Sequence, residues 1–457
     1  MNDPQENDSF NRAFVHGELH LGFWSFVKKG TGALNSFFVL SSLSLYQFGS
    51  YQLLLSLYGI LSDIFQDLFG EVMVNDLARF IGEGREDKAK RLFFEYASFR
   101  TVMAVIPCAG LFFAAPFLSF RYGSDTVNTI RILSFLFLAD AGVALATLVL
   151  NLRLQFKILA PRATFQKLLQ FLALGSFYVF SHLGVREIFL SQIIGTAGTV
   201  LILLPVVIVN FAPWRRVKAF SSPLIFRIIR SYGKWEIPDI LLNDFTGKVR
   251  PWLIKLFLST EAVGIFSVAN TFISALKDLI PTRTAGVLVP RRAKDPAALE
   301  RFYRLGTKYY VWFGAALALA AAGGVPVVVH MLFPKFTSAL PVFYVMLVVV
   351  PMFAFVKPMS FFLVAFRRRR FIFLQSAFQN AVWLGLALIL LPTAGLLGLG
   401  LVEVVASGTN IVARYEYLKR AGLISRFSPR ALITFDSEDR MHGALLMRYL
   451  RSFLNRG

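Results

Sequence analysis

Long apolar runs recur along the chain from Leu21 to Val412, and each of them is long enough to cross a lipid bilayer. The hydrocarbon layer contains no water, so the backbone of such a run must satisfy its hydrogen bonds internally, as a helix does. The composition agrees, because 56% of the 457 residues are hydrophobic and only 16% are charged. A typical soluble protein has about 25% charged residues. The sequence therefore predicts an all-α, polytopic membrane protein.

The apolar runs predict about 12 transmembrane helices, arranged as two six-helix lobes around a central cavity. The predicted spans are 24–45, 50–74, 94–119, 128–150, 163–183, 187–210, 233–258, 263–289, 307–332, 338–364, 371–391 and 395–417. Most connections are short, so neighbouring spans are expected to run antiparallel.

The net charge of +21 comes largely from loops that are rich in Lys and Arg. These cations fall in every second connection, as in Arg79–Arg91, Arg215–Arg230, Arg291–Arg304 and Arg367–Arg370, whereas the alternate connections are nearly uncharged. By the positive-inside rule, the basic connections and both termini are cytoplasmic. We therefore expect a multi-pass protein of the cell (inner or plasma) membrane, and we expect no nucleic-acid partner.

The chain also repeats itself. Leu45–Ile64 aligns without a gap on Thr260–Leu279, which places Gly49 on Gly264 and Asp63 on Asp278. Six predicted spans separate the two copies, so both have the same orientation in the membrane, as in a parallel repeat about an axis along the membrane normal. The predicted domains are a cytoplasmic N-terminal segment (1–22), an N-terminal lobe (23–211), a cytoplasmic linker (212–230), a C-terminal lobe (231–419) and a basic amphipathic tail (420–457).

Charged residues inside the span 233–258 are the strongest candidates for a binding site. A charge at the centre of a membrane helix costs about 2.5–3.5 kcal/mol, so several in one span indicate a helix that lines a wet cavity. Asp244 and Lys248 are four residues apart and are expected to pair, whereas Lys248, Arg250 and Lys255 together leave a cationic excess. The next span adds the cations Lys277 and Arg283. The alternative reading is that these residues form structural ion pairs.

Acidic residues inside the spans are candidates for binding a coupling ion, either H⁺ or Na⁺. Asp140 lies in the middle of its span, and Asp63 and Asp278 occupy equivalent positions of the repeat. Asp63, Asp67 and Glu71 are each four residues apart and predict an acidic stripe on one helix. Asp244 is a further candidate.

The chain lacks the motifs of an enzyme or of a cofactor site. It has one cysteine, Cys108, and five scattered histidines, so no cluster of metal ligands is visible in the sequence. No P-loop lysine motif is present. We therefore expect no catalytic residues, no metal and no cofactor beyond the coupling ion.

The two copies of the repeat also carry a resemblance to a known family. Leu43–Phe93 (LSLYQFGSYQLLLSLYGILSDIFQDLFGEVMVNDLARFIGEGREDKAKRLF) and Lys234–Leu276 (KWEIPDILLNDFTGKVRPWLIKLFLSTEAVGIFSVANTFISAL) resemble the polysaccharide biosynthesis proteins. These are lipid-linked oligosaccharide (O-antigen type) flippases of the MATE-like MOP exporter superfamily. The resemblance extends from Phe23 to about Lys419 in span count and bipartite layout.

This resemblance implies alternating access between two lobes and the transport of an undecaprenyl-diphosphate-linked glycan to the outer leaflet. It implies a cationic lumen, here formed by Lys248, Arg250 and Lys255, with membrane lipids and polysaccharide polymerase machinery as further partners. The acidic residues in the same span depart from a simply cationic lumen.

Two other functions remain open from the sequence. One is a MATE-like, ion-coupled multidrug antiporter, for which Asp63, Asp140 and Asp278 would serve as an acidic site for organic cations. The other is a membrane polymerase or ligase for lipid-linked glycans, which would need a long outer loop with catalytic residues, and the sequence shows no such loop.

Overall fold

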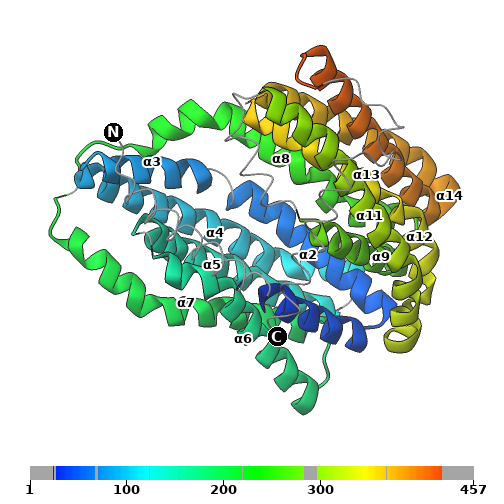
Figure 1. Cartoon of the computed structure of the whole chain (residues 1–457). Helices are drawn as coiled ribbons and strands as arrows, with labels where there is room; N and C mark the ends of the chain where they lie inside the picture. Colours follow the sequence, from blue (N-terminus) through cyan, green and yellow to red (C-terminus); the bar gives the residue numbers. More distant parts are fainter. Residues whose placement is uncertain are drawn as a thin grey trace, which may run out of the picture. The chain divides into compact units, whose positions relative to one another are not determined.

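A computed structural model describes residues 24, 27–66, 70–122, 124–153, 155–218, 220–281, 296–366 and 368–424. Within these residues the secondary structure is helical and contains no strand, so the predicted all-α class is confirmed (Figure 1). The chain divides into two compact units. The first comprises 1–269, 327–340 and 388–396, and the second comprises 270–326, 341–387 and 397–457.

The first unit begins with a helix over 27–42 and contains most of the labelled helices of the N-terminal half. These are α2 (Leu45–Phe65), α3 (Gly70–Gly82), α4 (Glu86–Tyr122), α5 (Ser124–Leu152), α6 (Phe156–Phe180), α7 (Val185–Arg215), α8 (Ile225–Phe257) and the first half of α9 (Thr260–Leu279). The remaining elements are α11 (Pro296–Leu332), the 3₁₀ helix η1 (Pro334–Ala339), α12 (Leu340–Leu347), α13 (Val349–Ala365) and α14 (Arg369–Arg420).

Several of these helices are long and apolar enough to cross a membrane. By length and composition, six helices of the described chain qualify, or seven if η1 with α12 and α13 forms one bent span. The helix α14 has 52 residues, and the left-handed backbone of Gly395 (φ 59°) divides it into two segments of membrane-spanning length. This break agrees with the predicted boundary between the spans 371–391 and 395–417.

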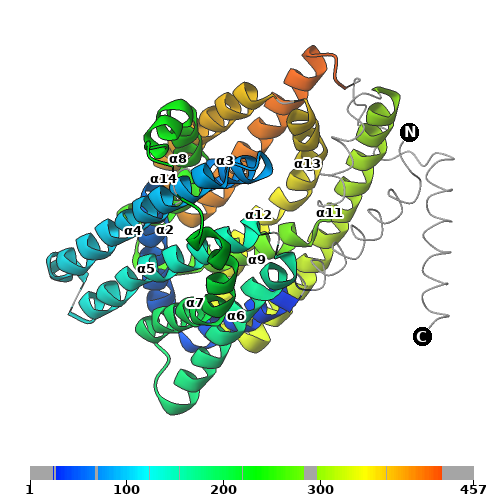
Figure 2. The ribbon, with the colours of Figure 1, turned by 90° about the vertical axis from the view of Figure 1, so that its left-hand side faces the viewer.

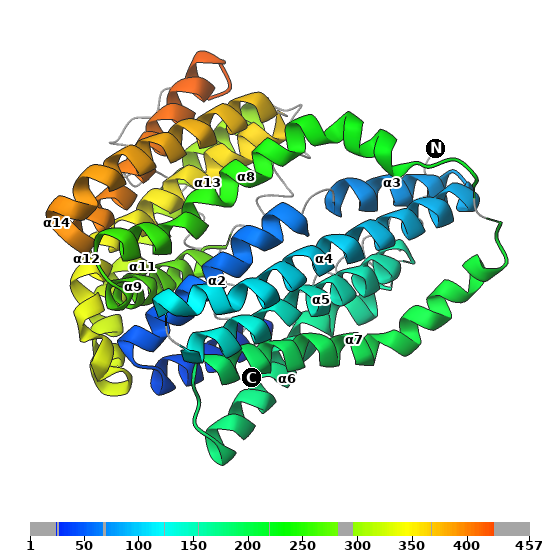
Figure 3. The same ribbon diagram turned by 180° about the vertical axis from the view of Figure 1, so that it is seen from behind.

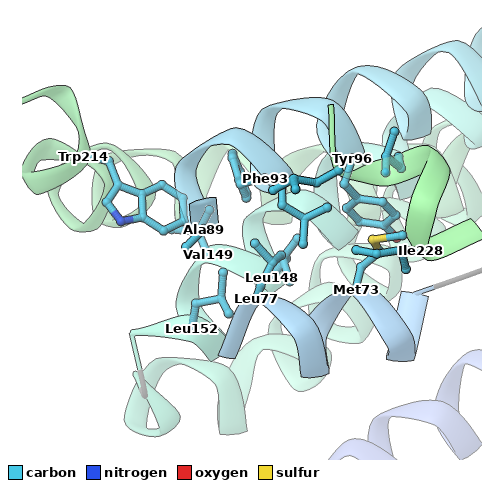
Figure 4. Packing of buried hydrophobic residues seen from close by; sticks show 13 residues of the cluster. Met73, Leu77, Ala89, Phe93, Tyr96, Leu148, Val149, Leu152, Trp214 and Ile228 are labelled. Carbon is cyan, nitrogen blue, oxygen red and sulfur yellow. The ribbon is translucent and has the colours of Figure 1, made fainter. Parts of the chain in front are cut away.

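In the first unit, α4 packs on α5, α5 packs on α7, and α7 packs on α6 (Figure 2). At one end of these helices, α3 packs on α4 and contributes to a hydrophobic cluster. Its Met73 and Leu77 are fully buried against Phe93 and Tyr96 of α4 (Figure 4). Trp214 at the end of α7 and Ile228 at the start of α8 complete the same cluster, which ties the connection between these two helices to the bundle.

The predicted span 50–74 is wrong as a single helix. The helix α2 ends at Phe65, and a separate helix, α3, begins at Gly70. The end of α2 is fixed by a buried cation, because Arg100 Nη1 donates to the Gln66 carbonyl at 2.8 Å and to the Tyr96 hydroxyl at 2.9 Å. Of the predicted acidic stripe, Asp63 lies on α2 and Glu71 on α3, so these two residues do not share a helix. Asp67 and the side chain of Glu71 lie outside the described residues.

Two further spans differ from the prediction. The helix α9 ends at Leu279, well before the predicted end at 289, because Pro281 follows and cannot donate a backbone hydrogen bond. Residues 282–289 lie outside the described residues.

The predicted span 338–364 is bent by 40° between α12 and α13, at a break next to Val348. The tail helix predicted within 420–457 lies largely outside the described residues, which end at 424.

The two copies of the repeat have the same local structure. In this alignment Leu45, the first residue of α2, falls on Thr260, the first residue of α9. Each helix is preceded by a Leu-Ser pair, and each serine hydroxyl accepts a hydrogen bond from the third residue of the helix, at 3.2 Å for Ser44 and 3.1 Å for Ser259. The helix before each copy also ends at the equivalent residue, Ser42 or Phe257.

The first turns of α2 and α9 touch each other reciprocally. A methyl group added to Gly49 would overlap the carbonyl oxygen of Thr260, and one added to Gly264 would overlap the carbonyl oxygen of Leu45. Since Leu45 and Thr260 are themselves equivalent residues of the repeat, this contact has the symmetry of a local two-fold axis. Both glycines are needed here because only a residue without a Cβ allows two helix backbones to approach so closely.

Candidate functional site

The centre of the candidate site is an ion pair between two neighbouring helices of the first unit, α2 and α8 (Figure 3). The Lys248 ammonium on α8 pairs with the Asp63 carboxylate on α2. The Asp63 side chain is only 10% exposed, whereas the Lys248 side chain keeps 27% of its surface accessible. The Lys248 chain crosses α2 at Gly59, where an added Cβ would lie 3.0 Å from its Cε. Gly59 therefore leaves the room that the lysine needs to reach Asp63.

A second contact fixes the backbone of α8 beside this ion pair. The Ser56 hydroxyl, two turns before Asp63 on α2, donates to the backbone carbonyl of Lys248. The same hydroxyl accepts a hydrogen bond of 3.1 Å from the indole nitrogen of Trp252. One buried serine of α2 thus contacts both Lys248 and Trp252, which are one turn apart on α8. These contacts fix the position of Lys248 along the axis of α2.

The structure brings together two residues to which the sequence analysis assigned different roles. Asp63 was a candidate for ion coupling, Lys248 a candidate for substrate binding, and the expected partner of Lys248 was Asp244. The observed partner is Asp63, and the side chain of Asp244 lies outside the described residues. An anion that approaches Lys248 therefore competes with a carboxylate that is already in place.

The other two predicted cations of α8 lie further along the same helix. The Arg250 guanidinium stands 5.6 Å from the centre of the Phe266 ring of α9, as in a cation–π contact. Lys255 is partly buried in the last turn of α8. Of these three predicted cations, Lys248 is paired with an acid and Arg250 lies over an aromatic ring.

Asp140 lies on α5 and also has defined surroundings. The Tyr58 hydroxyl of α2 donates to its carboxylate, and the rings of Tyr58 and Phe137 lie 4.6 Å apart. The helix α6 supplies two cations, because Arg162 and Lys167 both interact electrostatically with this carboxylate. The acid therefore belongs to a polar network of three helices.

The second unit contains its own group of cations. Lys277 on α9 and Lys357 on α13 lie over the same ring, that of Phe353, at 5.7 Å and 4.4 Å from its centre. Arg414, on the part of α14 after Gly395, donates to Gln375 Oε1 at 3.0 Å and to the Ser360 hydroxyl. Both acceptors are neutral, and among the described residues Arg414 forms no ion pair. Arg414 is therefore held by neutral groups, whereas Lys357 interacts electrostatically with the carboxylate of Asp278.

Sequence reasoning missed part of this second group. It did not place Lys357, Arg414, Ser360 or Gln375 in a candidate site. A usable signal was present, because an arginine within a predicted span, six residues before the end of α14, is a candidate for more than anchoring. Of the other predicted residues, Asp278 is exposed at the end of α9, and Arg283 lies outside the described residues.

The cations of this arrangement can bind anions. Its groups are ammonium, guanidinium, carboxylate and hydroxyl groups on helices of membrane-spanning length. Within the described part of the chain, no three His, Cys, Asp or Glu side chains are gathered as the ligands of a metal ion would be.

Comparisons with known proteins agree with this description. The family model "Polysaccharide biosynthesis protein" matches residues 43–335, which is more than half of the chain. No curated protein matches the sequence.

Among solved structures, the lipid II flippase MurJ in an inward closed conformation is similar, with a TM-score of 0.68 and 11% identity over 90% of this chain and 89% of that protein. An inward-facing multidrug resistance MATE family transporter of the MOP superfamily has a TM-score of 0.66 and 14% identity over 86% and 94%. A MOP superfamily transporter from Pyrococcus furiosus, described as having a binding pocket of reversed polarity, has a TM-score of 0.55 and 14% identity over 92% and 96%. At these identities the likeness concerns the fold.

Proposed function

The chain belongs to the polysaccharide biosynthesis protein family, and from this premise we propose that it is a flippase for a lipid-linked glycan. The cargo would be an undecaprenyl-diphosphate-linked oligosaccharide or a related polysaccharide precursor, moved from the cytoplasmic to the outer leaflet by alternating access. Membership of the family supports a glycan as the cargo. The lipid II flippase among the similar structures supports transport of a lipid-linked cargo from one leaflet to the other.

The observation that carries this proposal is the Lys248–Asp63 ion pair inside the first unit. A pyrophosphate that crosses a bilayer loses its hydration, and fixed cations in a protein-lined path offset that cost. In the empty protein Asp63 neutralises Lys248, so the cation is not buried alone. An incoming phosphate replaces Asp63 as the partner of Lys248, while Arg250 and Lys255 of the same unit provide further positive charge. Lys277 stays a prediction from the sequence. Arg283 remains a predicted member of this set.

Displacement of the Asp63 carboxylate would couple binding of the phosphate to binding of an ion. When the phosphate takes Lys248, Asp63 loses its counter-ion and favours binding of a proton or Na⁺. Asp140, held by Tyr58, is the second candidate for this role, and Asp244 and Asp278 remain weaker ones.

A charge exchange tests whether Lys248 contacts the cargo. Lys248→Ala and Arg250→Ala should each reduce surface glycan at matched protein level, whereas the exposed cation Arg216 on the end of α7 provides a control, Arg216→Ala, with wild-type export. In the double variant Asp63→Lys with Lys248→Asp, the ion pair can re-form with its charges exchanged. We expect normal protein level but impaired export, because the cation has moved to α2. Wild-type export in this variant would show that the pair is only structural.

The second candidate function is a multidrug antiporter, which the acids Asp63 and Asp140 and the MATE-like fold favour. Ethidium efflux from cells that express the protein distinguishes the two functions. We expect no efflux above that of cells with the empty vector. Efflux that is lost in Asp140→Asn and that exceeds any glycan export would support the antiporter instead.

The proposed direction of transport requires the topology that the loop charges predict, with both termini cytoplasmic. On a Cys108→Ser background, Lys218→Cys in the connection between α7 and α8 should be protected from an impermeant thiol reagent in intact cells. His182→Cys, in the connection between α6 and α7, should be labelled. Both residues are exposed, so access depends only on the side of the membrane. The reverse pattern would contradict the topology.

A further inference from the structure

A cavity of about 210 Å³ opens between α6 and α7, away from the ion pair of α2 and α8. Its lining combines two cations with an apolar wall. The residues that define it are Lys157, Arg162, Phe165, Thr199, Leu203 and Val206. Both helices belong to the first unit, so the cavity lies within one compact part of the molecule.

The cations stand at one end of the cavity. Lys157 is the second residue of α6, and Arg162 lies five residues further on, so both are within about 9 Å of the start of the helix along its axis. Lys157 is exposed. Arg162 donates to the Thr147 hydroxyl at 2.7 Å and interacts with Asp140 over a longer range. Among the described residues, neither cation forms an ion pair, so this end of the cavity presents a net positive charge.

The wall of the cavity is open to the surrounding bilayer. Phe165 is 42% exposed and Ile202 is 53% exposed, and further apolar side chains of α7, including Leu201 and Leu204, are also exposed. On a helix of membrane-spanning length, such side chains face lipid tails. The cavity is therefore a lateral groove that begins at a cationic end, near the membrane surface where the loops are basic, and continues along an apolar surface.

We propose that this groove binds an anionic phospholipid of the inner leaflet, with its phosphate between Lys157 and Arg162 and one acyl chain along Phe165 and Leu203. Basic pockets between membrane helices on the cytoplasmic side suit anionic headgroups. A free phosphate would leave the apolar wall unfilled, and a zwitterionic lipid would not neutralise the two cations. The groove is a site separate from the one that carries the proposed function.

Lipid binding to the purified full-length protein tests the proposal. Native mass spectrometry in a neutral detergent would compare phosphatidylglycerol, phosphatidylcholine and glycerol phosphate. We expect a bound phosphatidylglycerol that neither of the others replaces. A surface cation contributes about 1 kcal/mol to the binding of an anionic lipid, or about five-fold in affinity. Lys157→Gln should therefore weaken binding about five-fold, and Lys157→Gln with Arg162→Gln about 25-fold.

Two further variants separate charge from shape. Arg216→Gln removes an exposed cation at the end of α7, outside the groove, and should leave the affinity unchanged. Thr199→Trp keeps both cations but fills the cavity, and it should weaken binding as well. If the Arg162 variant does not fold, Lys157→Gln and Thr199→Trp still decide the question.

Equal binding by wild type and Lys157→Gln would overturn the proposal, as would equal binding of phosphatidylcholine. Preferential binding of a polyprenyl phosphate over phosphatidylglycerol would also overturn it, because the groove would then hold a carrier lipid rather than a phospholipid. These measurements require no transport, so their failure and a failure of glycan export remain distinguishable.

Discussion

The helices α2 and α9 are two copies of one sequence pattern, and they agree in their first halves and differ in their second. Both begin after a Leu-Ser pair with the same serine cap, and both place a glycine in the contact between them. Near their ends, Asp63 is buried and paired with Lys248, whereas its equivalent Asp278 is exposed. In the same alignment the residue equivalent to Lys248 is Ala33, which has no charge. The repeat therefore retains its architecture at one end and has acquired an asymmetric charge at the other.

This difference indicates which features of the repeat are structural and which are functional. A contact that both copies share serves the packing of the fold, because it is needed whatever the protein transports. An ion pair that only one copy can form is not required by the repeat, and it is the better candidate for binding cargo. Three predictions follow from this contrast.

The largest effect is expected at the shared glycines. Gly49→Leu and Gly264→Leu each force a side chain into the backbone of the other helix, and overpacking of this kind costs about 3 kcal/mol. Because the contact is reciprocal, the two variants should lower the melting temperature in detergent by similar amounts. Gly30→Leu, in the first helix, is the control, since no atom lies within 4 Å of the position of its Cβ. A large decrease in melting temperature for only one of the two variants would show that the contact is not reciprocal.

An intermediate effect is expected at the repeated aspartates. Asp63→Ala leaves the Lys248 ammonium without its partner, and we expect a loss of about 2 kcal/mol, which allows for the partial exposure of the lysine. Asp278→Ala, at the exposed equivalent position, should cost less than about 0.5 kcal/mol. Chemical unfolding of the two variants in the same detergent measures the difference. Equal losses would mean that Asp278 is as important to the fold as Asp63.

The smallest effect is expected at the serine beside the ion pair. Ser56→Ala removes the donor to the Lys248 carbonyl and the acceptor for Trp252, at a cost of about 1 kcal/mol. Ser36→Ala is a matched control, because its hydroxyl donates only to the Gly32 carbonyl of its own helix at 3.1 Å and is exposed. If Ser56 positions Lys248, glycan export should fall in Ser56→Ala but not in Ser36→Ala. A change in stability without a change in export would limit Ser56 to a structural role.

The helical class, the presence of several membrane-spanning segments and the repeat were all predictable from the amino-acid sequence alone. These depend on local properties, since hydrophobic length sets a span and a capping serine sets a helix start. The sequence also identified Lys248 and Asp63 as residues that need an explanation, because a charge in an apolar helix is costly wherever it lies.

The ion pair between Asp63 and Lys248 is visible only in the folded chain, because these residues are far apart in the sequence. The partner that the sequence indicated for Lys248 was Asp244, one turn away on the same helix, and the side chain of Asp244 lies outside the described residues. Likewise, the break after Phe65 depends on Arg100, a residue of another helix that satisfies the carbonyl of Gln66. Which residues pair across two helices depends on how these helices pack. Hydrophobic periodicity within one helix does not indicate which residues of another helix lie opposite it. For this reason the fold was predictable from local patterns, whereas the partners within the site were not.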